Sequence, residues 1–297
     1  MNPEVFAARR AAFRKLHESG FFILPNPWNI GTARYLRSLG FKALATTSSG
    51  FAFANGLPDA EWAISRDMAL QHIRTIVESV GSGPDALPIN ADFESGYAHK
   101  PEEVAQNVRL CVATGVAGLS IEDATGDPSR PLYDLALAIE RIRASRAAID
   151  QTGTGVLLTA RAESFFVNHP EPLTDAIRRL TAYADAGADV LYAPGLRTRQ
   201  EIEAIVSAVA PKPVNVLVTS SHGPSPAELA AIGVRRVSTG SALARAAWTG
   251  FLQAAHLIAR ENSMTGLDGA IPFADLNTFF RKDQAQRAID DADKPEN

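Results

Sequence analysis

The sequence predicts a (β/α)8 barrel, the α/β TIM-barrel fold in which eight parallel strands alternate with helices. Eight short runs rich in β-branched and aliphatic residues recur along the chain, and segments with helical periodicity separate them. No stretch rich in Pro, Gly or Ser divides the series into domains. Eight units without a break favour a closed barrel over an open doubly wound sheet.

The predicted strands are short and alternate with helices in order along the chain. They cover residues 21–26, 43–48, 88–93, 118–123, 156–161, 190–195, 214–219 and 235–240. Between two of them, Leu173 and Ile177 follow the spacing of a helix with one apolar face. Helices are expected to end at Gly115, Gly187 and Gly233, because each glycine follows a helical pattern and precedes a strand.

Additional helices flank this series. We expect an extra helix at about residues 3–18, the eighth barrel helix at about residues 241–262, and another helix from about Phe273. The chain ends in a charged tail, DDADKPEN. The expected organisation is a barrel with its N-terminal helix over residues 1–262, followed by a C-terminal helical extension and tail over residues 263–297.

The composition narrows the classes of function. The net charge of −4 comes without a cationic stripe, so we expect no nucleic-acid partner. No apolar run reaches the length of a membrane span and the N-terminus has no signal-peptide core, so we expect no membrane partner and a cytoplasmic location. The single cysteine, Cys111, excludes an intramolecular disulfide and any zinc site built from several cysteines.

Polar side chains gather at the predicted carboxyl ends of the strands, where the catalytic groups of such barrels lie. The stretch PINADFESGYA places Asn90, Asp92 and Glu94 on alternate positions of one run. We expect the polar residues of all the strand ends to converge on one mouth: Asn26, Thr46 to Ser49, Asn90, Asp92, Glu94, Glu122, Asp123, Arg161, Glu163, Asn215, Thr219 and Ser238.

Two carboxylates at neighbouring strand ends, Asp92 and Glu122, suit a divalent cation such as Mg²⁺. The alternative is a structural ion network in which both carboxylates pair with Arg161. The guanidinium of Arg161 can also hold a substrate carboxylate with two hydrogen bonds. The sequence therefore predicts a site for a small anionic substrate.

Loops after the strands add weaker candidates. TTSSG (46–50) offers hydroxyl and N–H groups for a carboxylate or phosphate, and the long segment 51–62 is expected to fold over the mouth with Asp59 near a metal-bound water. STGSALA fits either a phosphate site or an ordinary Ser-capped helix. His222 is either an acid/base group or a solvated loop residue.

Taken together, these stretches resemble the isocitrate lyase/phosphoenolpyruvate mutase superfamily. The resemblance runs from PNPWNIGTARYLRSLGFKALATTSSG through NADFESGYAHKPEEV, GVAGLSIEDAT, LLTARAESF and AYADAGADVLYAPG to RRVSTGS. It implies a barrel whose eighth helix is exchanged between the subunits of a homodimer, with dimers often paired into a homotetramer. It also implies Mg²⁺ or Mn²⁺ and small 2-oxo or 2-hydroxy carboxylic acids that react through an enolate-like unit.

The resemblance implies roles for individual residues. Asp92 and Glu122 match the metal site, Asp59 its outer shell, and Arg161 the arginine that binds the anionic end of the substrate. We expect Arg161, Glu122 and Asp59 to be catalytic. We expect the substrate to contact Thr47, Ser48, Ser49, Asn90, Arg161 and Asn215.

Two departures from the superfamily pattern bear on the chemistry. The metal motif Asp-Ala-Asp reads Asn90-Ala91-Asp92 here, which predicts weaker metal binding, and Glu94 is the candidate to compensate. The loop after the fourth strand reads EDATGDPSRPLYD in place of Lys-Lys-Cys-Gly-His, so the catalytic cysteine of isocitrate and methylisocitrate lyases has no counterpart. The longer gating loop of the mutases is not matched either.

The sequence favours a metal-dependent carbon–carbon lyase that acts by retro-aldol cleavage or by decarboxylation of an oxaloacetate-like acid. Phosphonopyruvate hydrolysis or phosphoenolpyruvate mutase-type chemistry at a P–C bond is the alternative within the same fold. A catalytically inert oxoacid-binding protein and a sugar-phosphate enzyme that binds phosphate at Gly240 and Ser241 are further alternatives.

Overall fold

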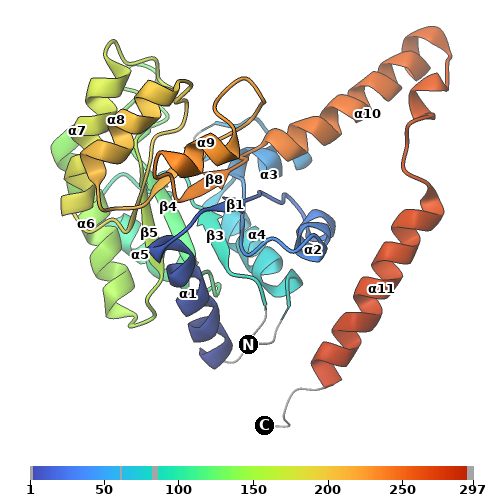
Figure 1. The fold of residues 1–297 in the computed structure, drawn as a ribbon, viewed down its shortest axis with the longest axis horizontal. Coiled ribbons are helices and arrows are strands. Elements are labelled where there is room, and N and C mark those ends of the chain that lie inside the picture. The colour runs from blue at the N-terminus through green and yellow to red at the C-terminus, as the bar shows by residue number, and fades with distance from the viewer. Residues whose placement is uncertain (1–2, 61, 82–85, 293–297) are drawn as a thin grey trace.

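The protein folds as the predicted (β/α)8 barrel (Figure 1). A computed structural model describes residues 3–60, 62–81 and 86–292. Its strands form one parallel sheet in the order β1-β8-β7-β6-β5-β4-β3-β2. β1 and β2 complete the ring through a hydrogen bond of 3.1 Å from the N–H of Ala45 to the carbonyl of Pro25.

Every strand lies within one of the predicted runs and is shorter than that run. The strands are β1 (Phe22–Leu24), β2 (Leu44–Ala45), β3 (Ile89–Asp92), β4 (Gly118–Glu122), β5 (Leu157–Arg161), β6 (Val190–Tyr192), β7 (Val214–Leu217) and β8 (Arg236–Ser238). Most of the difference lies at the carboxyl ends, where the chain leaves the sheet early and enters the loops that form the mouth.

Helices cover the outside of the ring. They are α2 (Ile30–Ser38), α4 (Arg66–Ser79), α5 (Pro101–Val112), α6 (Leu135–Gln151), α7 (Pro172–Asp185), α8 (Arg199–Val209) and α9 (Pro226–Ala231). Gly115, Gly187 and Gly233 follow three of them with φ of 92°, 101° and 90°. These left-handed conformations favour glycine and confirm the predicted helix ends.

The N-terminal helix α1 (Pro3–Glu18) closes the bottom of the barrel. Phe13 is fully buried inside the ring, and Gly118 makes room for it, because a Cβ at that position would lie 2.7 Å from the Phe13 ring. Nε of Arg10 donates to the carbonyl of Val116 at 3.0 Å. α1 therefore covers the amino-terminal end of the sheet, and the mouth lies at the opposite end.

The segment predicted as a serine-rich loop contains a short helix instead. Residues Ser48–Ala54 form α3, and Oγ1 of Thr47 caps it by accepting from the N–H of Gly50 at 3.2 Å. The reason is local: a threonine cap precedes an apolar run, FAFA, which packs one face into the protein. Of the segment expected to cover the mouth, residue 61 lies outside the described residues, and Asp59 lies at the rim of the cavity.

The main hydrophobic core lies between the ring and the helices. Leu119 and Leu158 point outward from neighbouring strands and are fully buried against residues such as Ile142 and Ile205. Because side chains alternate along a strand, the intervening positions point into the barrel. Many of those inward positions are polar, which leaves the interior available for a site.

Two long helices extend away from the barrel, α10 (Ala242–Glu261) and α11 (Phe273–Ala292), with a short 3₁₀ turn, η1 (Thr265–Leu267), between them (Figure 1). Asn262 ends α10 in a left-handed conformation, with φ of 48°. α11 packs against α2, where the rings of Phe279 and Tyr35 lie 5.1 Å apart and Asp283 pairs with Arg34 at 3.7 Å. Both helices were predicted, and residues 293–297 of the charged tail lie outside the described residues.

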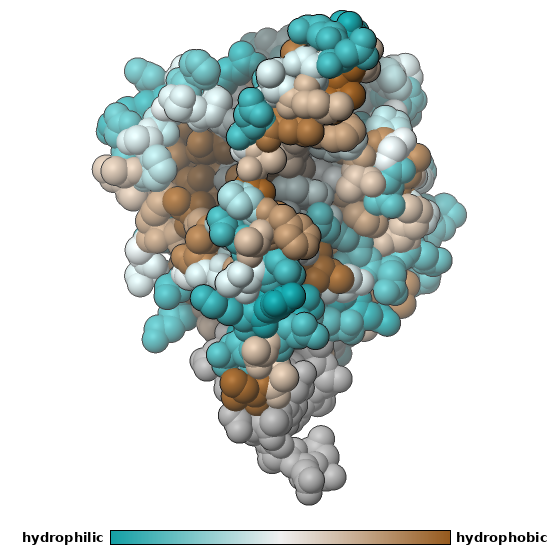
Figure 2. All heavy atoms as spheres, turned by 90° about the vertical axis from the view of Figure 1, so that its right-hand side faces the viewer, coloured by the Kyte–Doolittle hydropathy of each residue, from teal (hydrophilic) through white to brown (hydrophobic). Residues whose placement is uncertain are grey.

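α10 exposes large apolar side chains. Phe251 is 60% exposed, and Trp248 and Leu252 are also exposed. Figure 2 shows hydrophobic side chains on the face of the molecule that carries these two helices. The exchange of this helix between subunits stays a prediction, as does the division of the chain at residues 262 and 263. No helix in the described ranges combines the length and hydropathy needed to cross a bilayer.

Candidate active site

A cavity of about 800 Å³ opens at the carboxyl ends of the strands. Its lining includes every residue to which the sequence analysis gave a catalytic, substrate-binding or metal-binding role: Thr47, Ser48, Ser49, Asp59, Asn90, Asp92, Glu122, Arg161 and Asn215. The structure therefore brings the predicted residues together, while their chemical roles stay predictions.

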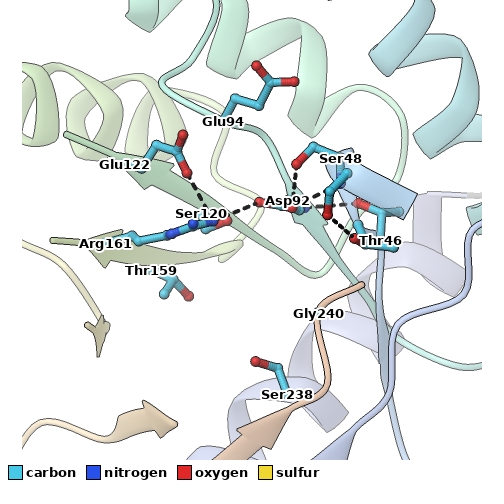
Figure 3. Close-up of polar contacts among 12 residues, drawn as sticks. Thr46, Ser48, Asp92, Glu94, Ser120, Glu122, Thr159, Arg161, Ser238 and Gly240 are labelled. Carbon is cyan, nitrogen blue, oxygen red and sulfur yellow. Dashed lines mark hydrogen bonds and ion pairs between the residues drawn. The ribbon is translucent and has the colours of Figure 1, made fainter. Parts of the chain in front are cut away.

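Asp92 ends β3 and is held in place by the neighbouring strand end. Its Oδ2 accepts hydrogen bonds from the N–H (3.0 Å) and the Oγ (2.9 Å) of Ser48, and its own N–H donates to Oγ1 of Thr46 at 2.9 Å (Figure 3). Two donors on one oxygen fix the rotamer of the carboxylate. The other oxygen, Oδ1, faces Arg161.

Arg161 lies at the centre of a group of carboxylates. Its Nη1 is 2.9 Å from Oε2 of Glu122 and 3.6 Å from Oδ1 of Asp92, and the two nitrogens Nε and Nη2 both contact Glu163. Figure 3 shows the guanidinium directed between Glu122 and Asp92. The strand register explains the first contact, because Glu122 and Arg161 are paired across β4 and β5. The ion network considered as an alternative is thus present.

The carboxylates outweigh burial in setting the charge of Arg161. Burial disfavours the charged guanidinium, but Glu122 and Glu163 together raise the pKa of Arg161 well above its usual value. For Glu163 the balance is reversed: burial raises its pKa to about 6, although Arg161 opposes the shift. Arg161 is fully charged and largely neutralised by its own chain.

Asp123 does not join the mouth, which corrects the expectation that all the strand-end polar residues converge there. It is buried behind the sheet, where its Oδ2 accepts from the hydroxyl of Tyr183 (2.5 Å) and pairs with Arg179 (3.2 Å). Alternation along the strand is the reason: Glu122 points inward, so the next residue points outward. Oδ1 of Asp123 accepts from the N–H of Glu163 at 2.8 Å and so positions that residue indirectly.

Glu94 points away from Asp92, contrary to the alternation expected from the sequence. β3 ends at Asp92, and Glu94 adopts a left-handed conformation with φ of 44°. Its carboxylate accepts from the hydroxyl of Tyr97 (2.8 Å) and the N–H of Trp62 (3.3 Å), and Figure 3 shows it directed away from the Arg161 group. In this arrangement its carboxylate does not replace the one missing at Asn90.

Asn90 is buried in the wall of the cavity. Its Nδ2 donates to the carbonyl of Ala91 at 3.1 Å, but its Oδ1 has no hydrogen-bond partner among the described residues. Asn215 is also buried, and both ends of its amide are engaged: Oδ1 accepts from Arg236 (2.8 Å) and Nδ2 donates to Ser238 (3.0 Å).

Four further candidates line the cavity. Thr47 and Ser49 contact each other through their hydroxyl oxygens at 3.2 Å. Burial of the carboxyl group raises the pKa of Asp59, and repulsion from Asp92 adds a smaller increase, while Arg161 opposes the shift. His222 is exposed in the loop after β7, where its Nδ1 lies 3.2 Å from Oγ of Ser220.

Comparison with known proteins identifies the chain. The family model described as phosphoenolpyruvate phosphomutase matches residues 13–259. The chain belongs to this family. Its members and relatives are carbon–carbon lyases or mutases of the isocitrate lyase/phosphoenolpyruvate mutase superfamily, so the chain is an enzyme of that type.

Individual relatives of the phosphomutase family agree with this assignment. A crystal structure from Burkholderia cenocepacia J2315, provisionally described as a lyase/mutase, superposes with a TM-score of 0.87 at 46% identity and covers 93% of this chain and 98% of the other. An uncharacterized protein of Mycobacterium tuberculosis is 31% identical over 89% of this chain and 94% of its own length. An oxaloacetate decarboxylase of Rhodopseudomonas palustris is 34% identical, but the match covers only 48% of this chain and 50% of that enzyme.

The donor set fits the hard divalent cation that the superfamily resemblance implies. Asp92 and Glu122 offer carboxylate oxygens to one cavity, and Asn90 has an amide oxygen without a partner. No group of three or more His, Cys, Asp or Glu side chains in the described ranges is arranged to hold a metal. This is compatible with Mg²⁺, which commonly takes one or two protein carboxylates and completes its shell with water and substrate.

Some residues in the cavity wall were missed by the sequence analysis: Ser120, Tyr192, Arg236 and Arg245. Alternation could have found two of them. Ser120 is two residues before Glu122, and Arg236 is two residues before Ser238, so each shares the inward face of its strand. Tyr192 pairs with Arg161 in the strand register. Arg245 follows the first turn of α10, and no strand pattern points to it.

Proposed function

We propose that the chain is a divalent-metal-dependent carbon–carbon lyase that acts on a small 2-oxo or 2-hydroxy acid of the oxaloacetate type. The observation that supports this most strongly is the meeting of Asp92 and Glu122 at one nitrogen of Arg161 inside the cavity. Two acidic groups from neighbouring strands and one fixed cation form a site for a metal-bound anion. Membership of a family of lyases and mutases supports the same class of reaction.

Mg²⁺ or Mn²⁺ would be held by Asp92 and Glu122, with Asp59 in reach of a water of the metal. When bound, the cation acts as a Lewis acid for the negative charge that accumulates on the substrate oxygen as the carbon–carbon bond breaks. Ser48 orients Asp92 through its two hydrogen bonds. Arg161 limits the repulsion between the carboxylates.

Decarboxylation is the form of the reaction that the site supports best. The electron pair of the breaking bond moves onto the adjacent carbonyl oxygen, CO₂ leaves, and the resulting enolate takes up a proton at carbon. This route needs no strong base in the loop after β4. That loop contains no cysteine, and its ends are joined by an isolated bridge between Ala124 and Leu132. Asp59, with its raised pKa, is the candidate to supply the proton. The likeness to an oxaloacetate decarboxylase points the same way.

The test is a substrate panel of oxaloacetate, substituted malates and methylisocitrate, assayed with Mg²⁺ or Mn²⁺. We expect pyruvate or a related oxoacid to be released from at least one of them, and chelation to abolish the release. Assays with metal but no protein correct for the spontaneous decay of oxaloacetate. If no oxoacid is formed from any substrate with either metal, the proposal is wrong.

Chemistry at a P–C bond is the second candidate, because the matching family model is described as a phosphoenolpyruvate phosphomutase. Phosphonopyruvate would occupy the same site with its carboxylate at the metal. Phosphorus NMR of the reaction distinguishes the outcomes: inorganic phosphate indicates hydrolysis and phosphoenolpyruvate indicates mutation. Neither product is expected if the chain is a carbon–carbon lyase.

An inert oxoacid-binding protein is the third candidate, because Arg161 occupies the space between the two carboxylates and Asn90 replaces an acidic ligand. Calorimetric titration with 2-oxoacids distinguishes it. Binding without turnover at saturating Mg²⁺ and Mn²⁺ would favour this function over the lyase.

A further inference from the structure

The floor of the cavity carries a buried positive charge. Arg236, at the start of β8, is 2% exposed and lines the cavity together with Asn90, Ser120 and Asn215. Its side chain extends across the inside of the barrel, because Nη2 donates to Oγ1 of Thr159 at 3.2 Å. Thr159 belongs to β5, which lies three strands away around the ring. The guanidinium therefore lies beneath the mouth.

All the hydrogen-bond partners of Arg236 in the described residues are neutral. Nε donates to Oδ1 of Asn215 at 2.8 Å, and Nη1 donates to Nε2 of His17 at 3.3 Å. Nδ1 of His17 donates to the carbonyl of Phe13 at 2.8 Å, which leaves Nε2 as the acceptor. Burial, with a smaller contribution from repulsion by Arg236, lowers the pKa of His17 to about 3. The ring is therefore uncharged at neutral pH.

Arg236 nevertheless stays charged. Burial lowers its pKa to about 10, which is still well above neutrality. A buried charge is normally paired, because an isolated ion in the interior loses its hydration without compensation. Arg161 satisfies this rule with Glu122, Glu163 and Asp92. Within the described ranges Arg236 has no such ion pair.

A second observation points to a polar ligand at the same depth. Oδ1 of Asn90 is buried without a hydrogen-bond partner among the described residues, and Asn90 lines the lower wall of the cavity. The inward residues nearby are small, namely Ala45 and Ser120, so they leave space above the floor. An unpaired acceptor in such a wall requires a hydrogen-bond donor, and because a carboxylate or chloride has none, a water bound beside the anion would supply it.

We propose that Arg236 forms an anion subsite on the cavity floor, and that a ligand supplies its missing counter-charge. The ligand is a compact anionic group, either one carboxylate of the substrate or a free inorganic anion such as chloride. Asn215 fixes the orientation of the guanidinium, and Ser238 fixes Asn215 in turn at 3.0 Å. If the group is a carboxylate, the subsite rests on the proposed function and narrows the substrates to dicarboxylic acids, with one end at Asp92 and Glu122 and the other at the floor.

The first variant is Arg236→Gln, with Arg235→Gln as its matched control. Arg235 is the preceding residue and points to the other side of the strand, where Nη1 donates to the carbonyl of Gly20 at 2.9 Å. Binding of oxalate and malonate with Mg²⁺ is measured by calorimetry, and stabilisation by chloride is measured in melts without metal at constant ionic strength. We expect Arg236→Gln to weaken anion binding about 10- to 100-fold, and Arg235→Gln to leave it unchanged.

A second variant separates anion binding from folding. Asn215→Asp places a carboxylate next to Nε of Arg236 with almost no change in shape, while the hydroxyl of Ser238 can donate to it in place of accepting. We expect this variant to melt at a higher temperature than the wild type without ligand and to lose its response to anions. A residue with a purely structural role would not show this combination.

The outcomes identify the source of the anion. If chloride stabilises the wild type and both variants lose this stabilisation, the ligand is a free inorganic anion. If the variants lose only the binding of dicarboxylates with Mg²⁺, the ligand is the substrate carboxylate. If both variants bind these anions as the wild type does, the subsite does not exist. Since no turnover is measured, a failure of the proposed reaction leaves this result unaffected.

Discussion

Nη1 of Arg161 lies 2.9 Å from Oε2 of Glu122, and the same nitrogen faces Asp92 on its other side. A protein cation thus lies between the two carboxylates that we propose as metal ligands. Metal binding in this site must either coexist with Arg161 or shift it. The charge of the arginine and the charge of the metal are therefore alternative ways to offset the same repulsion.

Removing the guanidinium should expose that repulsion. We expect Arg161→Gln to lower the free energy of unfolding by about 3–5 kcal/mol in the absence of metal, because buried carboxylates lose their partner. Addition of Mg²⁺ should restore part of the loss. Urea unfolding with and without the metal measures both effects.

The control for this experiment is Arg143→Gln, which removes an exposed ion pair with Glu140 at 2.7 Å. We expect this variant to lower the free energy of unfolding by less than about 1 kcal/mol. An equal loss of stability in the two variants would show that the Arg161 network does not matter for the fold.

Asn90→Asp should strengthen metal binding. It restores a carboxylate at a position where the amide oxygen has no hydrogen-bond partner among the described residues. We expect the dissociation constant for Mn²⁺ to fall by about tenfold or more, because each added carboxylate strengthens the attraction for a divalent ion. Calorimetry with Mn²⁺ measures it, and Asn55→Asp, at the exposed end of α3, is the control. Unchanged affinity would mean that this position does not contact the cation.

Glu163 should make the protein less stable as the pH rises from about 4.5 to 6. Burial raises its pKa from 4.5 to about 6, so the folded state holds a proton in this range that the unfolded state has already lost. The cost of ionising it in the fold is on the order of 1–2 kcal/mol and is fully present above pH 6. The urea concentration at the midpoint of unfolding, measured from pH 4 to 7, should fall less steeply with rising pH in Glu163→Gln than in the wild type.

Glu203→Gln serves as the comparison for this pH series, since it removes an exposed carboxylate paired with Arg199 on α8. Its profile should follow the wild type. Identical slopes for Glu163→Gln and the wild type would exclude the raised pKa as a source of the pH dependence.

The exposed apolar face of α10 should hold subunits together. We propose a homodimer or homotetramer in which this helix packs on a second copy, as expected from the family resemblance. Phe251 is 60% exposed in the single chain, so Phe251→Glu should shift the mass in solution toward the monomer. Sedimentation velocity measures the mass, with Gln200→Glu on α8 as a control. A wild type that is already monomeric at micromolar concentration would contradict the proposal.

The barrel was predictable because its signals are local and repeated. Each strand appears as a short apolar run, and a glycine such as Gly115 or Gly187 marks the end of a helix through its left-handed conformation. α3 was missed because a threonine cap and a seven-residue helix resemble a serine-rich loop until the packing of FAFA is known.

Many members of the site were predictable, but their contacts were not. Strand-end position brought Asp92, Glu122 and Arg161 into one cavity, whereas the turn after β3 decided where Glu94 points. Arg236 escaped notice because a single arginine in a strand does not reveal that its side chain crosses the barrel to Thr159. Contacts between strands that are not neighbours depend on closure of the ring.

The most direct test of the metal-dependent site is Mn²⁺ binding to the wild type and to Asp92→Asn, each with oxalate. Electron paramagnetic resonance of the Mn²⁺ measures the binding. Asp127→Asn, in the exposed loop after β4, is the control. We expect the wild type and the control to bind Mn²⁺ and oxalate together, and Asp92→Asn to bind the metal at least about 100-fold more weakly. Equal Mn²⁺ affinity in Asp92→Asn and the wild type would contradict the account.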